Sequence, residues 1–202
     1  TLEFFRAVSI ETPKFIINSL LFCGLALIMC LVIGVPMAWI MGRTHAPGRE
    51  GMDALTTLIL AIPGTALGIA YVRAFNFPLP FIEIPLTGMW IILPLVLVVR
   101  RLPYTVRASF SSLLLVHQSM EEAAANVGAT GLRTFWDITV PLIWKGIFVG
   151  ALFSFITSIQ EASATIFLTL GGWEMIPFGI FTFYIAGSQS QAAALGVILI
   201  VL

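Results

Sequence analysis

Apolar residues gather in five long segments of this chain, and short polar stretches separate them. The segments run from about Phe15 to Gly42, Met52 to Phe75, Leu86 to Ser112, Leu142 to Leu170 and Gln191 to Leu202. A helix that crosses a bilayer needs about 20 mostly apolar residues. The pattern therefore predicts an all-α integral membrane protein with about five transmembrane helices, the last of them cut off at Leu202.

Two apolar stretches are shorter than a bilayer span requires. One is the uninterrupted apolar part of the third segment, and the other lies outside the five segments. A helix from Leu86 to Val99 would be about 21 Å long at about 1.5 Å per residue, against a hydrocarbon core of about 30 Å. We therefore expect the third helix to continue past Arg100 and Arg101. The stretch from Ile176 to Ala186 contains proline and glycine, and its length favours an interfacial or re-entrant piece.

The composition supports membrane insertion. The chain is 59% hydrophobic and 10% charged, with a net charge of zero, whereas soluble domains carry about 25% charged residues. The sequence contains no basic cluster of the kind that would indicate a nucleic-acid partner. Cys23 and Cys30 lie in one apolar segment, too far apart along a helix for a disulfide, and we expect them to be small core residues.

Lysine and arginine in the loops predict the orientation. Arg43 follows the first segment and Arg133 lies between the third and fourth, whereas the segments that contain Glu83 and Glu174 lack lysine and arginine. Because basic loops face the cytoplasm, we expect residues 113–141 to be cytoplasmic.

This orientation places Thr1 to Lys14 outside, and no cleavable signal sequence precedes it. The sequence ends at Leu202 in the middle of an apolar segment. We therefore expect residues 1–202 to be a single transmembrane domain that is incomplete at both ends, from a longer polypeptide.

The segment 113–141 contains a spaced motif. Its members are Glu122, Ala123, Ala124, Gly128, Ile138 and Pro141. The residues around Glu121 favour a helix, with Ser119 as its cap at capping-box spacing and Gly128 as its left-handed end. A second helix is expected to begin near Gly131 and to lead into Pro141.

This spacing resembles the EAA loop of binding-protein-dependent ABC importer permeases, in which Glu-Ala-Ala, Gly and Ile-x-Leu-Pro recur at these offsets. Val140 here replaces the leucine. Softer similarities to the iron(III)-type branch, which lies near the thiamine, aminoethylphosphonate, spermidine and sulfate permeases, occur at Asn18-Ser19, Arg43-Thr44, Pro63-Gly64-Thr65 with Gly68, and Arg101-Leu102-Pro103-Tyr104 with Arg107.

The resemblance implies a type I permease core in the bacterial inner membrane. Its implied partners are two cytoplasmic ABC ATPase subunits, a periplasmic solute-binding protein, and a second permease half that is identical, different or fused. The chain itself would be no enzyme and carry no cofactor, because ATP and Mg would bind the ATPase; no GxxxxGK[ST] sequence is present. The implied coupling residues are Glu121, Glu122, Ala123, Ala124, Gly128, Ile138 and Pro141.

Iron(III) is the first candidate substrate, with thiamine, phosphonate, polyamine or sulfate as alternatives. A different class, an ATP-independent secondary transporter, should show paired broken helices in inverted repeats, and the sequence shows no internal repeat. Neither a metal-ligand spacing nor a clustered catalytic set supports a metal site or a membrane enzyme.

Two polar stripes at helical spacing are candidates for the translocation pathway. They comprise Arg100, Arg101, Tyr104 and Arg107 in the third segment and Ser154, Ser158, Glu161 and Thr165 in the fourth. Charged residues at membrane depth usually face a bundle interior, and we hypothesise that Glu161 pairs with an arginine. In the alternative, the arginines snorkel to the cytoplasmic face and Glu161 is a structural hydrogen-bonding group.

Two glycine pairs predict close helix packing. Gly64 and Gly68 follow Pro63, and Gly146 and Gly150 form a second GxxxG pair. A hinge at Pro63-Gly64 is the alternative to packing. The loop with Pro78, Pro80 and Pro85 is expected to face the binding protein on orientation grounds.

Overall fold

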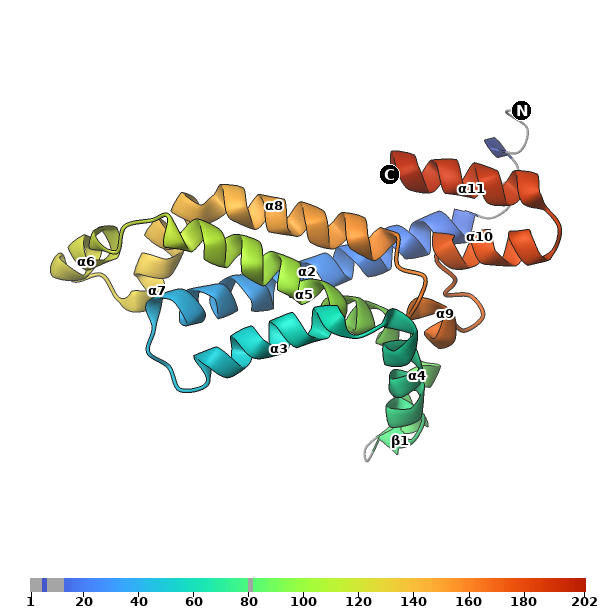
Figure 1. The fold of residues 1–202 in the computed structure, drawn as a ribbon, viewed down its shortest axis with the longest axis horizontal. Coiled ribbons are helices and arrows are strands. Elements are labelled where there is room, and N and C mark those ends of the chain that lie inside the picture. Colours follow the sequence, from blue (N-terminus) through green and yellow to red (C-terminus); the bar gives the residue numbers. More distant parts are fainter. Residues whose placement is uncertain (1–4, 7–12, 80–81) are drawn as a thin grey trace. The chain divides into compact units, whose positions relative to one another are not determined.

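The computed structural model describes residues 5–6, 13–79 and 82–202, and helices make up most of them (Figure 1). The helices are α2 (Pro13–Arg43), α3 (Arg49–Ala61), α4 (Gly64–Phe75), α5 (Ile92–Leu114), α6 (Ser119–Asn126), α7 (Gly131–Thr134), α8 (Val140–Ile159), α9 (Thr165–Leu168), α10 (Ile176–Ile185) and α11 (Gln189–Val201). A hairpin of β1 (Pro78–Leu79) and β2 (Ile82–Pro85) precedes a 3₁₀ turn, η1 (Leu86–Gly88), and a π-helical turn, η2 (Phe135–Thr139), joins α7 to α8.

The chain divides into two compact units. Unit 1 comprises residues 1–26, 62–99 and 155–202, and unit 2 comprises residues 27–61 and 100–154. Each of the helices α2, α5 and α8 contributes residues to both units. Residues 113–141, the predicted coupling loop, lie wholly in unit 2.

Within the described residues, two helices are long and apolar enough to cross a membrane: α2, and the continuous helix from Gly131 to Ile159. The first predicted span is thus confirmed as one helix. The third predicted segment forms α5, which continues past Arg100 and Arg101 to Leu114 as expected. Cys23 and Cys30 are buried free thiols, as predicted.

The second predicted segment is interrupted between α3 and α4, although the sequence suggested one helix. Pro63 has an extended backbone, with φ −57° and ψ 136°, and α4 begins at Gly64. Proline lacks an amide hydrogen, and its ring clashes with the preceding helical turn. The two helices count as a third candidate span only if they form one broken span.

The fourth predicted segment is also interrupted, which corrects the expectation of one continuous polar stripe. The helix α8 ends at Ile159, and α9 begins only at Thr165. The Glu161 carboxylate accepts from the Ala164 amide at 3.1 Å, and the Thr165 hydroxyl donates to the Glu161 carbonyl at 2.7 Å. Such local side-chain bonds compete with helical backbone bonds, so Glu161 and Thr165 do not continue the α8 face of Ser154 and Ser158.

The helices α10 and α11 pack side by side in unit 1 (Figure 1). Their core contains Ile176 and Leu195 together with Phe15 from α2. A Cβ at Gly179 would lie 3.1 Å from both Leu195 and Phe15, so glycine permits this close contact. With only 10 residues, α10 is too short to span a bilayer alone.

The loop before α10 is tied to the start of α2. The Asn18 side-chain amide donates to the carbonyls of Gly172 and Glu174 at 3.0 and 3.1 Å, and Lys14 pairs with Glu174 at 3.2 Å. Burial raises the pKa of Glu174, but backbone hydrogen bonds and Lys14 outweigh it, so the pKa is lowered. The carboxylate is therefore charged at neutral pH and holds the loop on α2.

Three of the four glycines in the two pairs, Gly68, Gly146 and Gly150, lie at close contacts, and Gly64 is buried. A Cβ at Gly68 would lie 2.8 Å from the Ala164 carbonyl oxygen, so α4 closely approaches the start of α9 in unit 1. In unit 2, a Cβ at Gly146 would lie 2.9 Å from the Ala108 carbonyl oxygen, and one at Gly150 would lie 3.0 Å from the Thr105 Cα. The α8 backbone therefore lies directly against α5.

Candidate functional site

The helix α6 begins as the sequence suggests but is capped differently. The Gln118 carbonyl accepts from the amides of Glu121 and Glu122 at 3.0 and 3.1 Å, so Gln118 is the cap position. The Ser119 hydroxyl instead pairs with His117 Nδ1 at 2.8 Å. The predicted Ser119 cap is therefore wrong, because the helix starts one residue earlier than the capping-box spacing requires.

The end of α6 follows the prediction. Gly128 has φ +86°, in the left-handed region. The Ala129 amide donates to the Ala124 carbonyl at 3.0 Å, and the Gly128 amide donates to the Ala125 carbonyl at 2.9 Å. These two bonds form a Schellman motif, which satisfies the last carbonyls of the helix. The second helix then begins at Gly131, as expected.

We expect Gly128→Ala to loosen α6. A Cβ there meets nothing within 4 Å, so the cost arises from the left-handed backbone, about 1 kcal/mol. Hydrogen–deuterium exchange should show faster exchange in residues 119–127. Gly131→Ala is the matched control, since its Cβ also meets nothing within 4 Å and its φ is not left-handed. Equal exchange in both variants would contradict the left-handed cap.

The two glutamates of α6 have different surroundings. Glu121 is largely buried, with a side chain 13% exposed, and Ala124 on the same face is buried. Glu122 and Ala123 are exposed, and Val127 beyond the helix is 86% exposed. The outward face of the helix thus combines the Glu122 carboxylate with small and polar side chains, among them Ser119, Ala123 and Asn126, while Glu121 is held inward.

Glu121 belongs to a hydrogen-bond network with Arg43 and Thr139. Arg43 Nε donates to Glu121 Oε1 at 3.1 Å, and the Thr139 hydroxyl donates to the same oxygen at 2.9 Å. Arg43 Nη2 also donates to the carbonyls of Leu113 and Val116. From the sequence, Arg43 was identified only as a loop cation and as part of a family similarity. The signal that could have indicated its role was its position directly after the first apolar segment.

A cavity of about 350 Å³ lies between α6 and the following helix. Its lining includes Ala124, Val127, Gly128, Arg133, Asp137 and Ile138. Small residues at the motif positions keep the cavity open, and the Arg133–Asp137 ion pair at 3.2 Å borders it. The motif residues Ala124, Gly128 and Ile138 therefore meet at one hollow next to the exposed face of α6.

Pro141 follows the π-helical turn η2. A π-helical turn widens the helix, and such turns are frequent at functional sites. Proline has no amide hydrogen to donate to the preceding turn, and the wider turn before Pro141 accommodates the missing hydrogen bond. The helix from Gly131 can therefore pass through Pro141 into α8 without a break.

The side chains of Thr105 and Arg107 on α5 have partners within unit 2. The Ser154 hydroxyl donates to the Arg101 carbonyl at 3.1 Å and bonds to the Thr105 hydroxyl at 2.9 Å. Arg107 pairs with Asp53 at 2.9 Å and also bonds to Thr57. The partners Asp53 and Thr57 on α3 were not identified from the sequence.

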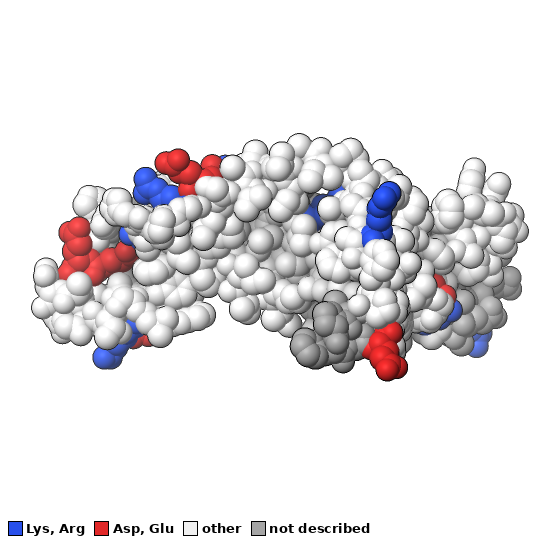
Figure 2. Space-filling model, turned by 90° about the horizontal axis from the view of Figure 1, so that it is seen from below, with Lys and Arg blue, Asp and Glu red and all other residues white. Residues whose placement is uncertain are grey.

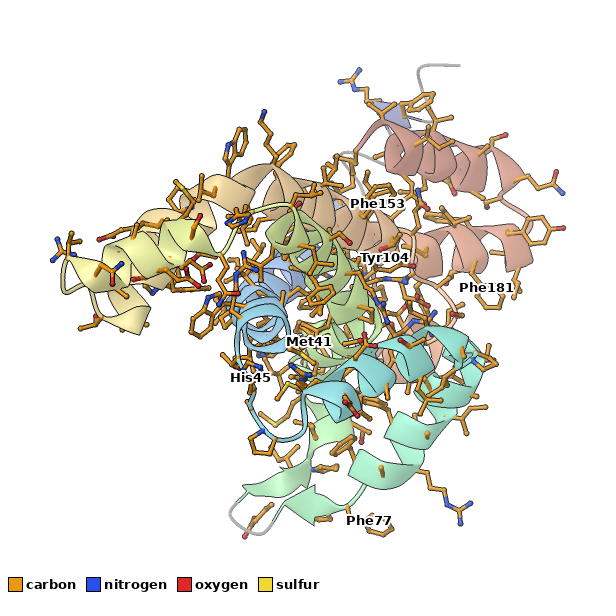
Figure 3. The ribbon with its side chains drawn as sticks, turned by 60° about the vertical axis from the view of Figure 1, so that its left-hand side comes forward. Met41, His45, Phe77, Tyr104, Phe153 and Phe181 are labelled. Atoms are coloured by element: carbon orange, nitrogen blue, oxygen red, sulfur yellow. The ribbon has the colours of Figure 1, made fainter. Side chains whose placement is uncertain are left out.

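A smaller cavity, of about 260 Å³, lies beside the Arg107–Asp53 pair. Met41, at the end of α2, contributes to its lining (Figure 3). Tyr104 lies on α5, one turn before Arg107 (Figure 3). Most of the face shown in Figure 2 is uncharged, and its Lys, Arg, Asp and Glu side chains form a few separate groups. A predominantly uncharged surface is expected for a protein in lipid.

In unit 1, Glu161 is buried, and one of its oxygens is engaged locally. Oε1 accepts from the Ser163 hydroxyl at 2.6 Å and from the Ala164 amide at 3.1 Å. Ser158 and Thr165 are also buried. These bonds agree with the structural alternative for Glu161, while its pairing with an arginine stays a prediction. Among the residues described, no cluster could hold a metal ion.

Comparisons with known proteins agree with the motif. Residues 34–202 match the family described as "binding-protein-dependent transport system inner membrane component". The ferric transport system permease FbpB of Actinobacillus pleuropneumoniae is 31% identical over 186 residues, which are 92% of this chain and 26% of the relative. The molybdenum permease ModB of Escherichia coli K12 is 31% identical over 198 residues, 93% of this chain and 86% of the relative. The sulfate permease CysT of the same strain is 30% identical over 143 residues, 68% of this chain and 52% of the relative.

The chain therefore spans about a quarter of the length of the ferric relatives that it matches. Among solved structures, the inward-facing methionine ABC transporter MetNI gives a TM-score of 0.73 at 16% identity, over 93% of this chain and 87% of that chain. A bacterial ABC importer of alginate gives 0.70 at 16% identity, over 98% of this chain and 79% of that chain. These likenesses show the fold, which is the predicted type I permease core. The chain belongs to the inner membrane components of binding-protein-dependent transport systems, the permeases of ABC importers.

Proposed function

We propose that this chain forms one half of the translocation pathway of an ATP-driven importer and that α6 docks on a separate cytoplasmic ATPase. The observation that carries the proposal is the outward face of α6, where Glu122 and Ala123 are exposed while Glu121 is held inward. A short helix with small side chains lets a partner approach closely. The exposed carboxylate of Glu122 offers a charge to a basic group of that partner.

The partners proposed are those expected from the sequence: two ATPase subunits, a second permease half and a periplasmic binding protein. The chain contains no phosphate-binding loop, so ATP and Mg are assigned to the ATPase. The location proposed is a bacterial inner membrane, which the family description and the apolar helices support.

The polar side chains predicted from the sequence remain the proposed pathway residues, each group within its own unit. Arg100, Arg101, Tyr104, Arg107 and Ser154 belong to unit 2, and Ser158, Glu161 and Thr165 belong to unit 1. Burial of Arg101, Ser154 and Glu161 in an apolar chain supports their placement inside the bundle.

The proposed substrate is a small inorganic ion. Relatives at about 30% identity are named for ferric iron, sulfate and molybdenum. Iron(III) is the first candidate because the sequence motifs resemble the iron(III)-type branch and the ferric permease FbpB is similar over 92% of this chain. ModB, at the same identity over 93% of the chain, makes an oxyanion the second candidate.

The proposal is tested by isolating the full-length protein from its native membranes with ATP and vanadate and identifying its partners by mass spectrometry. We expect an ABC ATPase and a periplasmic binding protein, whose bound ion would identify the substrate. Recovery of neither partner, together with transport that survives ATP depletion, would overturn the importer proposal and favour a secondary transporter.

A further inference from the structure

A largely buried guanidinium joins the first turn of α6 to the ends of two long helices in the same unit. Arg43 is the last residue of α2, and its side chain is 9% exposed. Its Nε lies 3.1 Å from Glu121 Oε1. Its Nη2 lies 2.6 Å from the Val116 carbonyl oxygen and 3.1 Å from that of Leu113. One side chain therefore contacts α2, the end of α5 and α6.

The chemistry of arginine suits this position. The last carbonyls of a helix lack helical partners, and the negative end of the helix dipole favours a cation there. Arg43 supplies that cation to α5 while its planar fork leaves Nε for Glu121. Lysine could provide the charge but not the several donors in fixed directions.

The network extends to the turn that leads into α8. Thr139, in η2, is fully buried, and its hydroxyl donates to the same Glu121 oxygen at 2.9 Å. Beside it, Trp39 on α2 packs edge-on against Phe135 of η2, with ring centroids 5.5 Å apart. Glu121 is thus held from two sides, by α2 and by η2.

The helix α6 has little else to hold it in place. It has 8 residues, and Ala124 is its one fully buried side chain. Burial of so little apolar surface holds a helix weakly, whereas charge-assisted hydrogen bonds among buried groups are strong and directional. Besides the chain segments at its two ends, α6 is therefore connected to the long helices through the hydrogen bonds of Glu121 to Arg43 and Thr139.

We propose that Arg43 is a positioning residue that makes α6 and the adjoining ends of α2 and α5 move as one body. A displacement that the ATPase imposes on α6 would then reach the membrane helices. The inference rests on the proposed function for the source of that displacement, but the linkage itself is a property of this chain.

The test uses the full-length permease with its ATPase in lipid nanodiscs. Spin labels at Ala125, which is exposed on α6, and at Val32, which is 67% exposed on α2, report their separation by double electron–electron resonance. Cys23 and Cys30 are buried, and unsubstituted protein corrects for any label on them. Singly labelled samples correct for distances between copies.

In the native background we expect one narrow distance that is the same without nucleotide and with ATP and vanadate. Arg43→Gln should instead give a broad distribution of distances between the two labels, and this distribution should change with nucleotide. The ATPase should remain bound, because Glu122 and Ala123 are untouched. Arg43→Lys should fall short of full rescue. Arg49→Gln, which removes a nearby exposed guanidinium bonded to the Thr44 carbonyl, is the matched control and should behave as native.

A narrow, nucleotide-independent distance in Arg43→Gln would overturn the inference. If Arg43→Gln does not reach the membrane folded, Glu121→Ala is measured instead, since it removes the acceptor of Arg43 Nε and leaves both carbonyl bonds of Arg43 in place. An unchanged distance there would overturn the inference equally. Failure of the importer proposal looks different, because the native permease would then carry no ATPase.

Discussion

Replacing Glu122 by arginine is expected to abolish ATP-driven uptake and to release the ATPase from the permease. Glu122 is exposed on the outward face of α6, where a basic partner group would meet a like charge after the substitution. Placing like charges against each other at an interface costs several kcal/mol, and each 1.4 kcal/mol weakens binding about tenfold. The measurement is the amount of ATPase that co-purifies with the full-length permease, together with uptake in cells.

The control for this prediction is Glu50→Arg. Glu50 is also an exposed glutamate in the first turn of a helix, α3, so both variants carry the same helix-dipole penalty, about 0.3–1 kcal/mol. We expect Glu50→Arg to retain the ATPase, and Glu122→Gln to bind with intermediate affinity because it removes the charge without reversing it. Full ATPase recovery with Glu122→Arg would show that α6 is not the docking element.

Replacing Gly146 by leucine is expected to prevent the permease from folding. A Cβ at this position would lie 2.5 Å from the Ser112 Cβ and 2.9 Å from the Ala108 carbonyl oxygen. Both contacts are below the distance that real Cβ atoms adopt, and backbone cannot move aside as a flexible side chain does. Overpacking costs about 1–3 kcal/mol and occasionally more, here at a contact between two long helices. Size-exclusion chromatography of a fluorescent fusion should show a loss of the monodisperse peak of about tenfold or more.

Gly24→Leu is the matched substitution. Gly24 lies inside α2, where a Cβ would meet nothing within 4 Å. Gly24→Leu introduces the same side chain into another long apolar helix, so any general effect of a leucine on membrane insertion is the same in both variants. We expect this variant to give a near-native peak, and a comparable loss in both variants would contradict the packing role of Gly146.

Much of the coupling loop could be predicted because its signals are local. Gly128 is left-handed since glycine alone adopts that conformation at little cost, and the helix before it follows from alanine and glutamate propensity. The start of α7 at Gly131 and the continuation of α5 past Arg101 were likewise readable from spacing and length. Each of these features depends on residues that are neighbours in the chain.

Other features depended on side-chain contacts that hydropathy and helix propensity do not show, some local and one distant in sequence. The break after Ile159 arises where Glu161 turns its carboxylate toward the Ala164 amide, and apolar periodicity alone continues through it. The Ser119 cap failed because α6 starts one residue earlier, and the Ser119 hydroxyl pairs with His117. Asp53 as the partner of Arg107 follows from the packing of α3 against α5, 54 residues apart in sequence.

By itself, the sequence determined that this protein is a helical membrane component of the ABC importer permeases, since hydropathy and a spaced motif are properties of the chain order. Only the tertiary structure decided that the adjacent glutamates have different surroundings. Glu121 and Glu122 are equivalent in propensity and charge, and they differ because helical rotation turns one toward Arg43 and Thr139 and the other outward. Which neighbours a helix face meets is settled by packing between distant segments, and that packing brought Arg43 of α2 against Glu121 of α6.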